Sequence, residues 1–264
     1  MKVGFIGCGN MATAMIKGMI QKGILDPDHI WAADVSKEFI ELKAKELGIH
    51  AAENNVELAK QCGIIVLSVK PQYYETVIRQ IRDVISQDQV VITIAPGKTL
   101  TWLGEQFGKE VKIVRTMPNT PALVGEGITG VCKNEWVSDA ELEQVLGILR
   151  SFGKAEVVGE NLMDVVVSVS GSSPAYVFML IEAMADGAVA DGMPRAQAYE
   201  FAAQAVMGSA KMVLETGKHP GELKDMVCSP GGTTMEAVRV LEEKGFRSSV
   251  IECMKACVKK ARGL

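Results

Sequence analysis

The residues near the start of the chain that are best suited to chemistry are the glycines of a short turn. Gly7 and Gly9 are followed by the small residue Ala12, after an apolar run over residues 3–6. Gly7 permits a tight turn, Gly9 lets the backbone approach a phosphate closely, and Ala12 allows a helix to pack on the strand. The N-terminus of that helix offers free N–H donors and a partial positive charge. This spacing predicts a pyrophosphate site for a dinucleotide, with a merely structural turn as the alternative.

Asp34 follows the next apolar run, residues 29–33, where a carboxylate can hold the ribose of an adenosine. A carboxylate there repels the additional phosphate of NADP and so favours NAD. Ser36 and Lys37 are near enough to accommodate that phosphate, so the choice between the two cofactors stays open. The alternative for Asp34 is a solvated turn residue.

Three further strand ends carry candidate site residues. Residues 69–71 and 95–97 end two strands, and their backbone is expected to line the nicotinamide. Lys70 is either catalytic or a solvated or phosphate-facing cation. After the following strand, prolines bracket Asn119 and Thr120 in a rigid turn that either faces the site or is purely structural.

Two polar segments interrupt otherwise apolar sequence in the second half of the chain, at residues 168–176 and 229–234. Glycines followed by hydroxyl residues at a helix start expose several N–H donors at once, which suits a small anion such as a carboxylate. The alternative is that Thr233 or Thr234 simply caps the helix expected at residues 235–243.

The histidines and cysteines argue against several chemistries. None of the three histidines, His29, His50 and His219, stands beside a nucleophile or in a metal-type cluster, so triad hydrolysis and zinc catalysis are not expected. The six cysteines lack the spacing of disulfide frameworks or zinc sites, which predicts reduced thiols in a cytoplasmic protein and no metal site. Reduction by hydride needs neither group, because a cofactor performs the difficult step.

Composition favours a globular chain that acts on a small molecule. The 264 residues are 48% hydrophobic and 23% charged, and the net charge of −4 offers no general basic surface for nucleic acid. The N-terminus is expected to enter a strand at once, so no export signal is expected. The uncharged run at residues 165–181 is interrupted by Ser-Gly-Ser-Ser-Pro, so no membrane anchor is expected.

Apolar strands and amphipathic helices alternate up to about residue 160, which predicts a Rossmann-type, doubly wound parallel sheet covered on both faces. Ser36 and Gly48 are expected to begin and end a helix over residues 37–47. The expected strands cover residues 3–6, 29–33, 63–69, 89–95, 111–115, 127–132 and 155–158. Of the other expected helices, the first ends near Lys22, a short one starts at Asn54 and Asn55, and three more cover residues 73–85, 99–107 and 139–152.

From residue 161 to 264 the pattern becomes helical, with long helices expected at residues 176–189 and 195–215. The second of these is rich in small residues and has few charges in its middle, so most of its sides must be buried. So short a domain has little interior in which to bury it. A second subunit in a symmetric dimer is therefore expected to cover it, and one compact helical core is the alternative.

Six stretches resemble pyrroline-5-carboxylate reductases, in order and along essentially the whole chain: residues 7–12, 69–71, 117–121, 170–176, 185–187 and 225–234. The last is close to that family's signature. The resemblance implies a Rossmann domain (1–160) and an all-helical substrate-binding and dimerisation domain (161–264), with dimers often assembling into a decamer. It also implies the last step of proline biosynthesis, in which NADH or NADPH reduces the imine of 1-pyrroline-5-carboxylate to L-proline.

The resemblance also assigns site residues. The substrate carboxylate is expected on Ser229, Gly232, Thr233 and Thr234, with Glu160 nearby and Thr234 relaying a proton to the ring nitrogen. The cofactor is expected to meet Ile6, Gly7, Cys8, Gly9, Asn10, Met11, Asp34, Asn55, Val69, Lys70, Pro71, Ala95, Pro96 and Gly97. The chain departs from the usual family pattern at Ser173, which replaces a glycine, and at Pro96, which replaces an alanine.

Two rival functions remain at this point. A β-hydroxyacid dehydrogenase has a similar plan but requires a catalytic lysine on a helix of the second domain, for which Lys211 is the main candidate, in a sequence that lacks that family's pattern. A redox-inactive cofactor-binding regulator is the other, and the intact segment at residues 229–234 argues against it.

Overall fold

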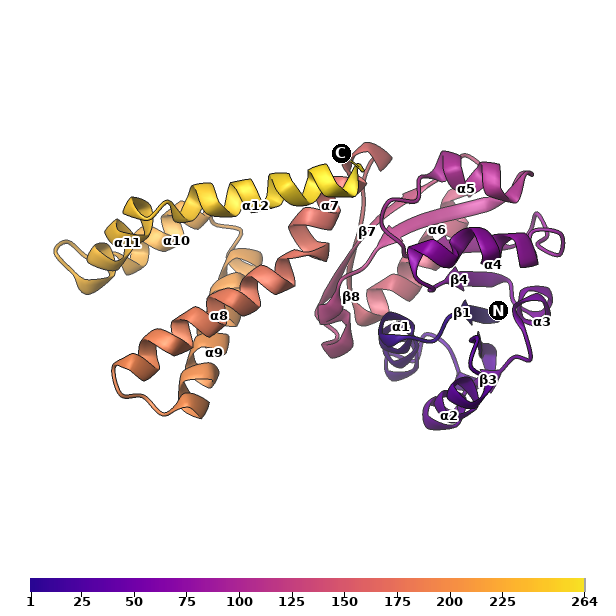
Figure 1. Ribbon diagram of the computed structural model, residues 1–264, viewed down its shortest axis with the longest axis horizontal. Coiled ribbons are helices and arrows are strands. Elements are labelled where there is room, and N and C mark those ends of the chain that lie inside the picture. Colours follow the sequence, from indigo (N-terminus) through magenta and orange to yellow (C-terminus); the bar gives the residue numbers. More distant parts are fainter. Residues whose placement is uncertain (264) are drawn as a thin grey trace. The chain divides into compact units, whose positions relative to one another are not determined.

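The computed structural model describes residues 1–263 and divides into two compact units (Figure 1). The first unit contains Met1–Ser172 together with the end of the chain from Cys257, and the second contains Ser173–Ala256. This division by compactness falls twelve residues after the domain boundary expected at residue 160. Each unit is described by itself.

Within the described residues, the first unit is built on an eight-stranded sheet with the order β3-β2-β1-β4-β5-β6-β7-β8. The strands are β1 Val3–Ile6, β2 Ile30–Ala33, β3 His50–Ala51, β4 Ile64–Leu67, β5 Val90–Thr93, β6 Lys112–Met117, β7 Gly127–Lys133 and β8 Gly153–Val157. Ile6 on β1 pairs with Ala33 on β2 and with Leu67 on β4. The strand order therefore reverses beside β1, and the crevice at this point is where open α/β sheets bind ligands.

The expected parallel sheet is confirmed, with one exception among the described pairs. β7 runs antiparallel to β6, and β8 is again parallel to β7. The connection from β6 to β7 contains only the short 3₁₀ helix Thr120–Val124. A parallel return needs a crossover of a dozen or more residues, so this short connection can only bring the chain back antiparallel.

Helices cover both faces of the sheet, as the alternation of strands and helices predicts. Val3 and Phe5 of β1 pack in one apolar core with side chains of α1, α2 and α6, and Ile6 packs in a second core with side chains of α3, α4 and α5. The helices of this unit are α1 Asn10–Gln21, α2 Lys37–Leu47, α3 Asn55–Gln61, α4 Tyr74–Ile81, α5 Leu100–Phe107, α6 Asp139–Leu149 and α7 Met163–Val166.

Local capping explains where two of these helices begin and end. The Ser36 hydroxyl accepts a hydrogen bond from the Phe39 N–H at 3.3 Å, and Gly48 adopts the left-handed conformation that ends α2, as expected from the sequence. Thr99 caps α5 in the same way, through the Trp102 N–H at 3.1 Å. These caps fix the entry of the chain into α2 and α5 beside the carboxyl ends of β2 and β5.

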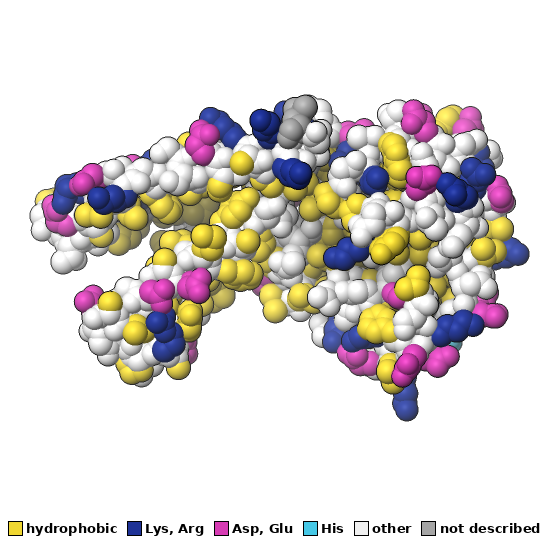
Figure 2. Space-filling view, viewed as in Figure 1, with side chains coloured by type: hydrophobic (Ala, Val, Ile, Leu, Met, Phe, Trp, Pro, Cys, Tyr) yellow, Lys and Arg dark blue, Asp and Glu magenta, His cyan; other side chains and the backbone are white. Residues whose placement is uncertain are grey.

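The second unit is helical throughout its regular structure. Its helices are α8 Ser173–Ala190, α9 Arg195–Thr216, α10 Pro220–Val227, α11 Thr233–Glu243 and α12 Phe246–Ala261, the last turn of which belongs to the first unit. The expected burial of α9 is not met within one chain, since among α8 and α9 only Ala185, Ala198 and Ala202 are buried. Large side chains such as Phe178 and Phe201 are about two-thirds exposed, and Figure 2 shows hydrophobic side chains along these helices.

The Ser-Gly-Ser-Ser-Pro run does not interrupt the helical path, contrary to the sequence expectation. The chain passes through a π-helical turn at Val167–Gly171, and Pro174 lies in the first turn of α8, where its missing N–H costs no hydrogen bond. By length and composition alone, the helical segment Glu160–Ala190 is long and apolar enough to cross a membrane. Only 6% of its most apolar stretch is buried, so its side chains need a cover that a single chain does not supply.

Candidate functional site

The glycine turn after β1 has the geometry that close approach of a phosphate requires. Gly7 has a positive φ of 92°, and a side chain there would meet the Ser68 carbonyl oxygen at 2.9 Å. Gly9 precedes α1, and a Cβ atom on it would meet nothing within 4 Å. Gly7 thus serves the turn itself, whereas the space above Gly9 is open to a ligand.

The first turn of α1 has N–H groups that no side chain of the described residues caps. No side chain caps the helix, and its first turn contains no acidic residue. The N–H groups of Asn10, Met11 and Ala12 precede the first i to i−4 bond of the helix, which Thr13 donates to the Gly9 carbonyl. Free N–H donors at a helix N-terminus fit the pyrophosphate of a dinucleotide.

Asp34 lies at the end of β2 and contacts the glycine turn directly. Its Oδ2 accepts a hydrogen bond from the Cys8 N–H at 3.0 Å, and its Oδ1 accepts a longer one from the Ser36 N–H at 3.4 Å. Burial, and after it the negative charge of Asp34, raise the pKa of the Cys8 thiol to about 11, so this cysteine is neutral. The structure therefore brings Ile6, the glycine turn and Asp34 together at the carboxyl ends of β1 and β2.

Hydroxyl groups of Ser68 and Tyr74 hold the chain at the carboxyl ends of β4 and β5. The Ser68 hydroxyl donates to the Gly7 carbonyl at 2.6 Å, and the Tyr74 hydroxyl donates to the Leu67 carbonyl at 2.6 Å. The Ile94 N–H in turn donates to the Tyr74 oxygen at 3.2 Å. Desolvation raises the pKa of Tyr74, which keeps it a hydrogen-bond donor. Tyr74 thus ties the segment before residues 69–71 to the segment before residues 95–97, a role that its place in an amphipathic helix did not reveal.

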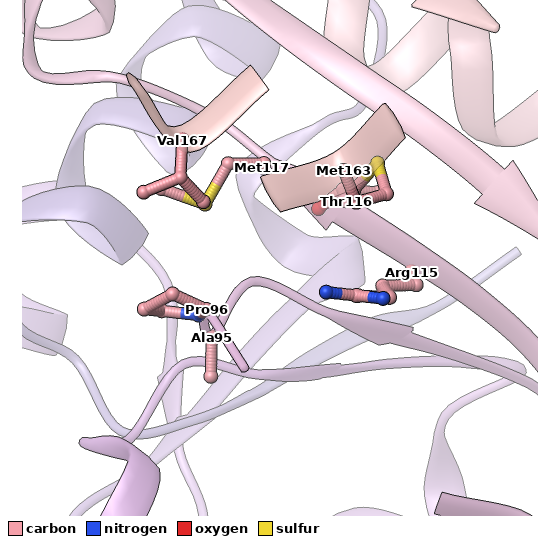
Figure 3. A pocket seen from close by; sticks show the side chains of 7 residues that line it. All are labelled: Ala95, Pro96, Arg115, Thr116, Met117, Met163 and Val167. Atoms are coloured by element: carbon pink, nitrogen blue, oxygen red, sulfur yellow. The ribbon is translucent and has the colours of Figure 1, made fainter. Parts of the chain in front are cut away.

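A small pocket lies at the carboxyl ends of β5 and β6. Its walls are mostly apolar, and Figure 3 shows the Arg115 guanidinium extending into it. The lining residues are Ala95, Pro96, Arg115, Thr116, Met117, Met163 and Val167. Of the predicted cofactor residues, the structure thus places Ala95 and Pro96 beside a buried cation.

Glu160 is held by two donors from different elements. Its Oε1 accepts from the Arg115 guanidinium at 2.9 Å and from the Leu100 N–H at the start of α5 at 2.6 Å. Asp164 lies 3.8 Å from the same guanidinium and 3.7 Å from Arg262 near the chain end. This network joins β6, α5 and α7 around the pocket. Sequence reasoning did not find Arg115, although a charged residue inside a buried strand was the available signal.

The polar segment before α11 leads into a helix that, within residues 1–263, begins without a side-chain cap. Gly232 is the N-cap residue, and a Cβ atom on it would collide with the Ser229 hydroxyl. No side chain of the described residues caps α11, because Thr233 and Thr234 occupy its first two helical positions. The interpretation in which either threonine is the N-cap is therefore wrong. Their hydroxyls, with that of Ser229, stand at an uncapped helix start.

The remaining candidates make contacts of their own or are exposed. Asn55 opens α3, and its side-chain amide donates to Gln80 at 2.7 Å. The Asn119 side-chain amide donates to the Ser170 carbonyl at 3.0 Å and accepts from the Ile128 N–H at 2.9 Å, so this amide stabilises the turn. Lys70 is exposed, and Lys211 forms an exposed ion pair with Glu215 at 3.5 Å. Among residues 1–263 no group of three His, Cys, Asp or Glu side chains is arranged to hold a metal ion.

Comparison with known proteins gives concordant matches over both halves of the chain. A family model described as pyrroline-5-carboxylate reductase dimerisation matches residues 160–264, and one described as NADP oxidoreductase coenzyme F420-dependent matches residues 2–97. A pyrroline-5-carboxylate reductase of Escherichia coli is 56% identical over 263 residues, covering 100% of this chain and 98% of the relative.

Solved structures are similar over the same length. A pyrroline carboxylate reductase of Plasmodium falciparum, solved with NADP bound, has a TM-score of 0.91 and 33% identity, covering 99% of this chain and 97% of the other. A pyrroline-5-carboxylate reductase of Coxiella burnetii has a TM-score of 0.92 and 34% identity, with the same coverage.

Proposed function

Because the chain belongs to the pyrroline-5-carboxylate reductase family, we propose how its own residues carry out that reaction. The protein is an oxidoreductase that reduces the C=N bond of 1-pyrroline-5-carboxylate with NADH or NADPH, which gives L-proline. The observation that carries the assignment to a site is the uncapped, hydroxyl-rich start of α11, within the stretch that resembles the family signature. The free N–H groups of a helix start suit the carboxylate group of 1-pyrroline-5-carboxylate.

The first unit binds the dinucleotide. The free N–H groups at the start of α1 hold the pyrophosphate, Asp34 meets the adenosine ribose, and residues 69–71 and 95–97 line the nicotinamide, which supplies the hydride. We assign to this site Ile6, Gly7, Cys8, Gly9, Asn10, Met11, Asp34, Asn55, Val69, Lys70, Pro71, Ala95, Pro96 and Gly97. Tyr74 and Ser68 keep two of these segments in place through backbone carbonyls.

The segment before α11 binds the substrate. Ser229, Gly232 and Thr233 hold the carboxylate through hydroxyls and backbone N–H groups, and the Thr234 hydroxyl hydrogen-bonds the ring nitrogen and relays its proton. An imine that binds already protonated needs little acid catalysis, so a hydroxyl suffices where a ketone would need a stronger acid. In this proposal Glu160 is the residue that the first unit contributes toward the substrate, and its Oε1 accepts hydrogen bonds from Arg115 and from the Leu100 N–H.

The helical domain, residues 161–264, also joins two subunits. The exposed apolar side chains of α8 and α9 lie within the match to the dimerisation model, which supports a homo-oligomer. In this proposal a second copy, and not a lipid bilayer or a nucleic acid, covers the apolar segment Glu160–Ala190. Five such dimers form a decamer in the cytoplasm, where the six free cysteines stay reduced.

The assay that tests this function follows the absorbance of NADH and of NADPH separately, with 1-pyrroline-5-carboxylate as substrate and a β-keto acid as control. Oxidation that requires the imine is the expected result. Oxidation with the keto acid alone would overturn the imine assignment. Cofactor binding without any turnover would instead support a redox-inactive regulator.

A further inference from the structure

We infer that Asp34 makes this chain selective for NADH over NADPH, an inference that rests on the proposed function. The sequence alone leaves the choice open, because it does not show where the Asp34 carboxylate points. The structure does: Oδ2 lies 3.0 Å from the Cys8 nitrogen of the glycine turn. The carboxylate is thus fixed beside the backbone that receives the pyrophosphate.

The fixed carboxylate retains the capacity to accept more hydrogen bonds. Each carboxylate oxygen has two lone pairs, and the two backbone donors, of Cys8 and Ser36, use only one on each oxygen. The remaining acceptors suit the 2′- and 3′-hydroxyls of the adenosine ribose in NADH. In NADPH a phosphate replaces the 2′-hydroxyl, and it offers no donor and brings negative charge against this carboxylate.

Among the described residues, no cation forms an ion pair with Asp34. Lys43 and Lys17 both pair with Glu46, at 2.6 Å and 3.5 Å, and these contacts lower the pKa of the Glu46 carboxyl. Sites for a 2′-phosphate typically use an arginine, and the first arginine of this sequence is Arg79, on α4. Lys37, the first residue of α2 and three positions after Asp34 in the sequence, forms no ion pair among residues 1–263.

Equilibrium binding measures the selectivity without any turnover. Quenching of protein fluorescence would give the Kd of NADH and of NADPH for the wild type, for Asp34→Asn and for Lys37→Ala as the control. Competition by ADP and by 2′,5′-ADP isolates the adenosine end. We expect NADH to bind the wild type about tenfold more tightly than NADPH, since like charges a few ångströms apart repel. In Asp34→Asn the ratio of the NADPH Kd to the NADH Kd should fall to about one, because the negative charge is gone.

The Asp34 variants remove the negative charge, whereas Lys37→Ala leaves the Asp34 carboxylate in place and removes a neighbouring positive charge. Asparagine can still accept from the Cys8 N–H, so Asp34→Asn should fold as the wild type does, and Asp34→Ser gives a second test without a carboxylate. Added salt should lower the ratio of the NADPH Kd to the NADH Kd in the wild type, because it screens the repulsion between Asp34 and the 2′-phosphate. Lys37→Ala should keep or widen the preference for NADH.

Two results would overturn the inference by itself. One is that NADPH binds the wild type as tightly as NADH. The other is that the ratio of the NADPH Kd to the NADH Kd is the same in both Asp34 variants as in the wild type. If either occurs while the imine is still reduced, only the role of Asp34 fails. If neither nucleotide binds, the proposed function fails with it.

Discussion

Arg115 and Glu160, 45 residues apart in sequence, form an ion pair with 2.9 Å between Nη1 and Oε1. The Arg115 side chain is only 4% exposed, whereas Glu160 is one-third exposed. The same Glu160 oxygen also accepts from the Leu100 N–H. One carboxylate thus satisfies both a buried cation and the start of α5.

Replacing Glu160 tests how much this arrangement stabilises the first unit. Glu160→Ala leaves Arg115 with only Asp164 at 3.8 Å and leaves the Leu100 N–H without its acceptor. Losing one partner of a fully buried pair costs about 3–5 kcal/mol, and partial exposure of Glu160 reduces the expected loss to about 2 kcal/mol. Urea unfolding at one fixed protein concentration measures it. Glu160→Gln keeps an oxygen acceptor and should lose less, so equal midpoints for the wild type and both variants would contradict the prediction.

Thr234 is expected to carry the proton relay. In Thr234→Ala the hydroxyl is gone, and kcat should fall by about 10- to 100-fold, less than typical for general acids because the imine binds protonated. Thr234→Ser retains a hydroxyl and should recover most of the activity. Thr216→Ala, which removes a hydroxyl that donates to the Met212 carbonyl on α9, is the control and should leave turnover unchanged. Full activity in Thr234→Ala would remove this residue from the mechanism.

Glu141 should make the protein sensitive to acid. The hydrogen bond from Lys112 at 2.6 Å, followed by that from the Ser138 hydroxyl, lowers the pKa of Glu141 from 4.5 to about 2. Because the folded-state pKa is depressed, the stabilisation is complete above pH 4.5 and disappears as the pH falls toward 2. Glu141→Gln should therefore be less stable than the wild type at pH 6 and nearly equal to it close to pH 2.

Urea midpoints measured from pH 6 downward test this dependence. Glu143→Gln on the same helix is the control, since its ion pair with Arg150 is exposed and contributes little at any pH. A stability difference between Glu141→Gln and the wild type that stays constant with pH would refute the role of this carboxylate.

The apolar surface of α8 should hold the oligomer together. Phe178 is 64% exposed in a single chain, and Phe178→Glu places a charge where we expect a second subunit. Light scattering after size-exclusion chromatography should show a smaller particle. Leu42→Glu on α2 is matched in exposure at 65% and should leave the assembly unchanged. An identical mass for Phe178→Glu and the wild type would show that α8 lies outside the interface.

Local features of this fold were predictable, because they depend on residues close in sequence. The caps at Ser36 and Thr99 and the left-handed Gly48 follow from side chains within one turn of a helix end. Apolar runs located every strand of the described sheet except the two-residue strand β3, and their alternation with helices predicted the two covered faces. Apolar periodicity did not reveal that β7 pairs antiparallel with β6, because periodicity reports burial and not the direction of the neighbouring strand.

The parts of the site that escaped prediction all join distant segments. Arg115 meets Glu160 only because β6 and the chain after β8 converge, and Tyr74 reaches Leu67 and Ile94 from a helix whose pattern shows only that it is buried. At the start of α11, residue type alone predicted the wrong N-cap. Thr233 and Thr234 are types that favour N-caps, yet Gly232 takes that position because a glycine fits beside Ser229.

Isotopic labelling shows whether the protein transfers a hydride to the imine of 1-pyrroline-5-carboxylate. The wild-type protein would be incubated with 1-pyrroline-5-carboxylate and NADH carrying deuterium at both C4 positions, and the product analysed by mass spectrometry. The account predicts L-proline that carries one deuterium on the former imine carbon. Oxidation of the cofactor without deuterium in proline, or the absence of proline, would contradict it.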